Sequence, residues 1–150
     1  MPIRKPQNRF GRHMIGTFSS IKLKRSIAYE SIIERDLYFA LDYEQNVTTF
    51  KEQPLVIPYE LNGRAHWYTP DVLIIYRDGS EVIAECKPQV FLDTENTRRQ
   101  LAAGELFCRA HAKTFRVYTD VELRSGYYLK NVKLLHKFGR YEVSSESLDI

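Results

Sequence analysis

The sequence predicts an α/β domain whose central mixed β-sheet is flanked by helices. Two apolar stretches, 72–76 and 81–84, are separated by an Asp-Gly turn and indicate neighbouring antiparallel strands. A helical segment at 94–111 then leads to a strand of alternating character at 114–119. Because a strand–helix–strand connection crosses over to a parallel neighbour, this order implies a sheet with both kinds of pairing.

Length and composition indicate one compact domain. A chain of 150 residues buries about 70% of its unfolded surface around a single core. Its 43% hydrophobic and 13% aromatic content excludes disorder over most of the chain. No stretch approaches the roughly 18 apolar residues of a membrane span, and no apolar run follows the basic N-terminus as in a signal peptide. We therefore expect a cytoplasmic protein without a membrane partner.

Residues 1–25 are expected to form a basic, extended arm in front of the domain at 26–143. The segment has no Asp or Glu and a charge of +7, against +3 for the whole chain. Such an arm can follow a nucleic-acid backbone, or it can be only a solubilising tail. The candidate DNA-binding residues are Arg4, Lys5, Arg9, Arg12, Lys22, Lys24 and Arg25.

A helix is expected to begin at Ser31, because Ser31 and Glu34 match a capping box in which Glu34 reaches back to the N–H of the cap residue. Apolar residues then recur at three- and four-residue spacings from Ile33 to Leu41. From the residues alone, capping and catalysis are equally good interpretations of Glu34. Glu30, one helical turn earlier, is the reserve candidate for catalysis.

Stretches 55–59 and 65–68 indicate a hairpin that continues into strand 72–76, so that three strands form a meander. Trp67 is expected to pack in the core. A last helix is expected at 127–138 and a frayed polar tail at 144–150. The two cysteines, Cys86 and Cys108, are expected to be unpaired, and the four histidines show no zinc-ligand spacing.

Asp71, Glu85 and Lys87 are the candidate site. Side chains alternate along a strand, so Glu85 and Lys87 share one face, about 7 Å apart. A two-residue loop between the strands would set Asp71 opposite Cys86, on the wrong face. A three-residue loop, whose last residue is Gly79 in the left-handed conformation, would set it opposite Glu85, and we expect this second arrangement.

Two carboxylates placed as direct cross-strand neighbours repel each other, which is costly unless a cation lies between them. Few protein ligands, waters and a phosphate suit Mg²⁺, with Mn²⁺ able to substitute. Lys87 would then orient the nucleophile or stabilise charge in phosphodiester hydrolysis. The competing interpretation is a solvated surface pair, which is common for a Glu and a Lys two residues apart on a strand. The apolar strands around these residues favour the site.

Three segments resemble the PD-(D/E)xK nucleases, and more narrowly the catalytic domain of TnsA-type transposon-end endonucleases. They are 29–36 (YESIIERD), 50–55 (FKEQPL), and 68–71 (YTPD) together with 85–88 (ECKP). The resemblance implies a restriction-endonuclease-like core. It implies metal ligands at Glu34, Asp71 and Glu85, with Lys87 as the catalytic lysine.

The resemblance also implies a role: nicking the 5′ ends of a transposon in double-stranded DNA, in concert with a DDE transposase and an AAA+ ATPase regulator. TnsA-type proteins generally carry a second, C-terminal domain, and we expect a departure from that pattern here, because the predicted nuclease core takes up most of the given sequence. The alternatives are a stand-alone phage or repair nuclease, and a catalytically silent module of the same fold that binds DNA or assembles with other proteins.

Overall fold

The computed structural model describes residues 15–125, 133, 136 and 137. Four strands form the central sheet in the order β3-β6-β7-β8. The β3–β6 and β6–β7 pairs are antiparallel, whereas β7 and β8 are parallel. This confirms the α/β class and the mixed sheet. The elements are β1 (Gly16–Ser20), β2 (Arg25–Tyr29), α1 (Ile32–Tyr43), β3 (Val47–Glu52), β4 (Ile57–Leu61), β5 (Arg64–Tyr68), β6 (Val72–Tyr76), β7 (Glu81–Lys87), η1 (Gln89–Phe91), α2 (Glu95–Ala110), β8 (Thr114–Thr119) and α3 (Asp120–Arg124).

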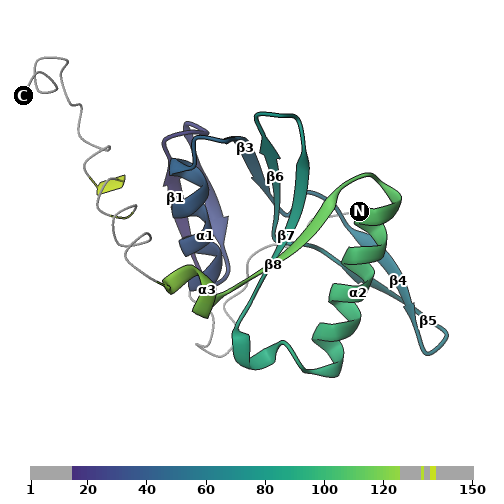
Figure 1. The fold of residues 1–150 in the computed structure, drawn as a ribbon. Coiled ribbons are helices and arrows are strands. Elements are labelled where there is room, and N and C mark those ends of the chain that lie inside the picture. Colours follow the sequence, from purple (N-terminus) through teal and green to yellow (C-terminus); the bar gives the residue numbers. More distant parts are fainter. Residues whose placement is uncertain (1–14, 126–132, 134–135, 138–150) are drawn as a thin grey trace, which may run out of the picture.

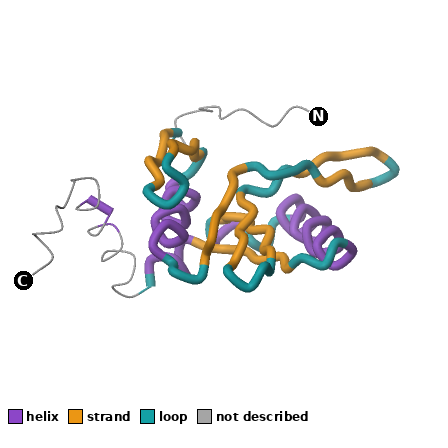
Figure 2. The backbone as a smooth tube through the Cα atoms, turned by 90° about the horizontal axis from the view of Figure 1, so that it is seen from above, coloured by secondary structure: helices purple, strands orange, loops and turns teal. Residues whose placement is uncertain are grey.

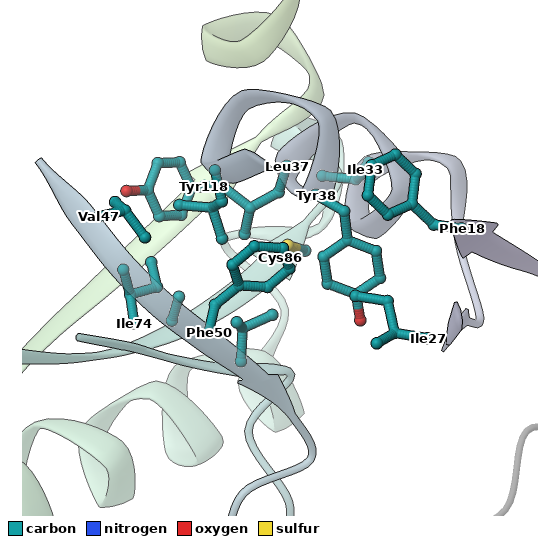
Figure 3. Packing of buried hydrophobic residues seen from close by; sticks show 13 residues of the cluster. Phe18, Ile27, Ile33, Leu37, Tyr38, Val47, Phe50, Ile74, Cys86 and Tyr118 are labelled. Atoms are coloured by element: carbon teal, nitrogen blue, oxygen red, sulfur yellow. The ribbon is translucent and has the colours of Figure 1, made fainter. Parts of the chain in front are cut away.

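The sheet lies between α1 and α2 (Figures 1 and 2). Towards α1 it presents Val72, Ile74, Ala84 and Cys86, which join Leu37, Tyr38 and Phe50 in the main core (Figure 3). On the other side, Ala103 of α2 packs with Ile57 and Tyr68 in a smaller cluster. At Gly104 the helix approaches β8 so closely that an added Cβ would lie 2.5 Å from the Phe115 ring. Both faces of the sheet are therefore covered by helices.

The turn between β6 and β7 confirms the three-residue loop. Leu73 pairs with Ile83 and Ile75 with Glu81, and the Tyr76 N–H donates to the Ser80 carbonyl at 3.0 Å. Gly79, the last loop residue, has φ +86°, which is the left-handed conformation that the bulged turn requires. The pairing runs to Val72 and Ala84, so Asp71 and Glu85 directly adjoin its last pair, as the three-residue loop predicts.

The predicted meander is wrong, because β5 does not pair with β6. Instead, β4 and β5 form a separate two-stranded ribbon, and β3 takes the place beside β6. In Figure 2 the ribbon extends away from the rest of the fold. Strands adjacent in sequence pair only about two-thirds of the time, and here Thr69 and Pro70 separate β5 from β6. The strand at β3 was not predicted.

The prediction of an extended basic arm at 1–25 is wrong for residues 16–25. Gly16–Ser20 and Arg25–Tyr29 form a hairpin that packs against α1, with Phe18 and Ile27 almost fully buried. These two apolar side chains anchor the hairpin, so the folded domain already includes residue 16.

The first half of the arm, the tail at 144–150 and most of the helix expected at 127–138 lie outside the described residues. In the part of the chain that is described, none of the helices has the length and apolar run that a membrane crossing requires.

Candidate active site

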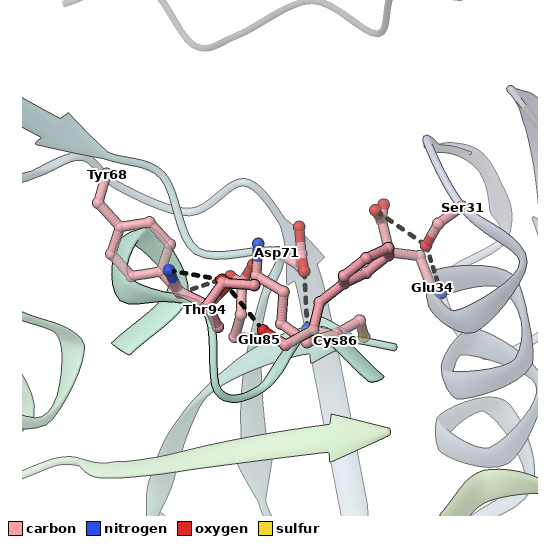
Figure 4. A network of polar contacts seen from close by, with 10 residues as sticks. Ser31, Glu34, Tyr68, Asp71, Glu85, Cys86 and Thr94 are labelled. Carbon is pink, nitrogen blue, oxygen red and sulfur yellow. Dashed lines mark hydrogen bonds and ion pairs between the residues drawn. The ribbon is translucent and has the colours of Figure 1, made fainter. Parts of the chain in front are cut away.

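Asp71 is held in place by both neighbouring strands. Its N–H donates to the Ala84 carbonyl at 3.1 Å, and its own carbonyl accepts the Gln53 N–H at 2.8 Å. Its Oδ2 accepts the Cys86 N–H at 2.8 Å, and the residue is 5% exposed. Backbone and side chain are thus both hydrogen-bonded, which fixes the direction of the carboxylate (Figure 4).

Glu85 lies beside Asp71 and is 4% exposed. The Asp71 carboxylate is close by, because its Oδ2 accepts the N–H of Cys86, the residue that follows Glu85. Glu85 Oε2 accepts the Tyr68 hydroxyl at 2.5 Å, and Oε1 lies 3.6 Å from the Lys87 ammonium nitrogen. The structure therefore brings together the three residues Asp71, Glu85 and Lys87, as the sequence predicted, and buries the two acids.

Burial raises the pKa of Glu85 well above its ordinary value, and the charge of Asp71 raises it further. The Lys87 ammonium and the Tyr68 hydroxyl act in the opposite direction. The pKa of Tyr68 is also raised, by its burial and by Glu85, so this phenol remains a hydrogen-bond donor. Two carboxyl groups in such a setting share a proton or bind a cation.

Glu34 occupies the N-terminus of α1 and acts there as a cap. Its N–H donates to Ser31 Oγ at 3.1 Å, while Ser31 donates to Glu34 Oε1 at 3.3 Å. Glu34 Oε2 accepts the N–H of Glu30 at 3.1 Å, rather than that of Ser31 as expected. These contacts confirm the capping interpretation. Glu30, the reserve candidate, accepts a hydrogen bond from the Gln53 amide at 3.3 Å.

The donor set fits a divalent cation with few protein ligands. Asp71 and Glu85 offer two adjacent carboxyl groups, and Mg²⁺ commonly uses one or two carboxylates and keeps several waters. Among the residues that the structure describes, no group of three or more His, Cys, Asp and Glu side chains gathers closely enough to hold a metal ion. The Glu34 carboxylate is engaged in the helix cap, and its charge acts together with those of Asp71 and Glu85 to raise the pKa of the Cys86 thiol, which burial raises most. Burial is the main cause of the raised pKa of the Tyr38 hydroxyl, and the charges of Glu34 and Asp71 raise it further.

The predicted basic residues have different surroundings. Arg4, Lys5, Arg9 and Arg12 lie outside the described residues. For Lys22 the DNA-binding prediction is corrected: its ammonium donates to the carbonyls of Leu41, Glu44 and Val47 at 2.8, 2.6 and 2.7 Å. These contacts use its three N–H donors, two at the C-terminal end of α1, where carbonyls lack helical partners, and one at the first residue of β3.

Lys24 and Arg25 remain candidates for phosphate contact. Lys24 is exposed at the turn between β1 and β2, with φ +56°. Arg25 donates to both carboxylate oxygens of Glu52, at 3.2 and 3.1 Å, and 43% of its side chain is exposed. An exposed ion pair of this kind contributes little, so a phosphate can compete with Glu52 for the guanidinium.

Sequence reasoning missed Tyr68 and misplaced Trp67. Tyr68 is 4% exposed and bonded to Glu85, whereas Trp67, expected in the core, is 55% exposed. Adjacent strand residues face opposite sides, and only the contact of β5 with α2 decides which side is buried. The position of Tyr68 three residues before Asp71 was the one available signal.

Comparison with known proteins identifies the family of this chain. A family model described as the TnsA-like endonuclease N-terminal domain matches residues 44–120, just over half of the chain, and these residues include Asp71, Glu85 and Lys87. No curated protein matches the sequence. The matched part runs from the end of α1 to the end of β8 and so contains the whole central sheet. The chain therefore belongs to the TnsA-like endonuclease family.

Proposed function

We propose that this endonuclease domain hydrolyses a phosphodiester bond of double-stranded DNA with the help of Mg²⁺, for which Mn²⁺ can substitute. The observation that carries the proposal is the burial of two neighbouring acids, Asp71 and Glu85, with the Lys87 ammonium nitrogen 3.6 Å from the Glu85 carboxylate. Burying two adjacent acids is unfavourable in itself. A cation compensates for this cost, and a reaction that needs the cation explains why both acids are present.

Each residue has a distinct part in this reaction. Asp71 and Glu85 would hold the ion, and the backbone contacts of Asp71 to β7 and to Gln53, directly after β3, keep its carboxylate directed at the site. When bound, the ion would supply a Lewis acid for the phosphate and lower the pKa of a water molecule. Lys87, partly exposed beside Glu85, would orient the attacking water or stabilise negative charge on the phosphate.

Glu34 would be a third ligand of the ion only in a state in which its carboxylate releases its hydrogen bonds with Ser31 and the Glu30 N–H. The family match supports a finer role, in which the domain nicks the 5′ ends of a transposon together with a DDE transposase and an AAA+ ATPase regulator. Phosphate contacts by the basic N-terminal residues, with Lys24 and Arg25, would give affinity without sequence preference.

Nicking of supercoiled plasmid in Mg²⁺ or Mn²⁺ tests the proposal, with and without a DDE transposase. Asp71→Ala is expected to abolish nicking. Asp78→Ala is the matched control, because Asp78 is exposed in the loop at the other end of β6. Cleavage that survives Asp71→Ala would remove the site assignment.

The requirement for a partner separates the alternatives. Nicking only in the presence of the transposase supports the transposition role, and nicking by the domain alone supports a stand-alone nuclease. No nicking under either condition, with DNA binding retained, identifies a silent module.

A further inference from the structure

The two carboxylate oxygens of Glu85 have different partners from different parts of the fold. Oε1 faces Lys87 on the same strand, at 3.6 Å. Oε2 accepts the hydroxyl of Tyr68, at 2.5 Å, from the separate β4–β5 ribbon. This second contact crosses between two sheets that are not hydrogen-bonded to each other through their backbones, and Figure 4 shows the Tyr68 ring reaching towards Glu85.

Tyr68 is well suited to hold another side chain. Its backbone is paired with Ile57 across the ribbon, and its ring packs with Ile57 and Ala103 of α2 in the smaller core cluster. A tyrosine has only two side-chain torsions, and packing on several sides restricts both. Glu85, by contrast, has three torsions that must be ordered before its carboxylate can act at a defined place.

The same short segment also positions the second acid. Tyr68 is followed by Thr69, by Pro70, which is almost fully buried, and by Asp71. Tyr68 therefore reaches Glu85 through its side chain, while the chain three residues later supplies Asp71. One segment of backbone sets the positions of both carboxylates.

We propose that Tyr68 is a positioning residue, which fixes Glu85 through Oε2 and so directs Oε1 towards Lys87 and a divalent cation. This inference rests on the proposed function, because it assigns Tyr68 to the support of a ligand of that cation. Partners of this kind behind a metal ligand typically change metal affinity or activity by about 10- to 100-fold.

Tyr68→Phe tests the proposal, since it removes one oxygen atom and preserves the ring. Tyr118→Phe is the matched control, because Tyr118 is also buried but its hydroxyl is influenced by Arg116, Tyr76 and Glu122 rather than by the acids of the site. Mn²⁺ binding is measured by electron paramagnetic resonance without DNA, beside thermal unfolding of each variant. We expect Tyr68→Phe to weaken Mn²⁺ binding about 10-fold or more, and Tyr118→Phe to leave it unchanged.

The outcomes separate this inference from the proposed function. If the wild type binds Mn²⁺ and Tyr68→Phe, still folded, binds it equally well, Tyr68 is not a positioning residue while the nuclease proposal stands. If the wild type binds no Mn²⁺ and nicks no DNA, both proposals fail. Loss of Mn²⁺ affinity in both tyrosine variants would show a general effect of core tyrosines and would also overturn the inference.

If Tyr68→Phe does not fold, a second measurement tests the proposal in protein that keeps Tyr68. In protein labelled with 3-fluorotyrosine, one ¹⁹F resonance is expected to shift on titration with Mg²⁺, and Glu85→Gln is expected to abolish that shift. A titration in which no tyrosine resonance moves would overturn the proposal.

Discussion

Glu85→Gln should change how stability depends on pH in a direction that the structure dictates. Burial and the charge of Asp71 raise the pKa of Glu85 above its ordinary value of 4.5. At a pH between the ordinary and the raised pKa of Glu85, the folded state binds one proton more than the unfolded state. The free energy of unfolding of the wild type therefore falls as pH rises through this window.

The magnitude follows from linkage. While Glu85 stays protonated in the folded state and ionised in the unfolded state, each pH unit costs about 1.4 kcal/mol of the free energy of unfolding. The fall stops once pH exceeds the raised pKa. Glutamine cannot ionise, so Glu85→Gln should remove this dependence on pH. The free energy of unfolding of the variant should therefore increase, relative to that of the wild type, with every pH unit above about 4.5.

Urea unfolding from pH 4.5 to 8 in EDTA measures the effect. The control is Glu60→Gln, which makes the same substitution at an exposed position on β4. Mg²⁺ at pH 8 should stabilise the wild type and leave Glu85→Gln less affected, since the ion takes over the role of the proton. Parallel stability curves for the wild type and Glu85→Gln in EDTA would refute the reasoning.

Three further substitutions test local parts of the fold by chemical unfolding. Ser31→Ala removes the helix cap and should cost about 1 kcal/mol; no loss would mean that Glu34 and its neighbours do not depend on this cap. Lys22→Met strips three carbonyls of their donor and should cost at least about 2 kcal/mol, without changing the salt dependence of DNA binding, whereas exposed Lys24→Met should change stability little. Gly104→Ala pushes a methyl group into the Phe115 ring and should cost about 1–3 kcal/mol from overpacking, and a gain in stability would show that β8 can shift away from α2.

Local sequence determined the strands and the turn that carry the site. The apolar stretches around 72–76 and 81–87 form strands, and in the second of them four consecutive residues, 83–86, are buried because helices cover both faces of the sheet. Gly79 in the left-handed conformation selects the three-residue loop, and that loop sets the register of β6 on β7. The placement of Asp71 and Glu85 next to the last pair of these strands therefore followed from residues within one hairpin. The helix cap at Ser31 could be predicted for the same reason, because all its partners lie within four residues.

Tertiary structure alone decided the contacts between distant segments. Lys22 is basic and near the N-terminus, and only the packing of the first hairpin on α1 shows that it binds the carbonyls at the helix end. Pairing of β3 with β6, and the hydrogen bond from Tyr68 to Glu85, likewise join residues 17 or more positions apart. The alternation of side chains along a strand predicts which of them share a face, but it does not predict which neighbouring element covers that face. The candidate acids were thus readable from sequence, whereas the groups that hold them depended on how the elements pack.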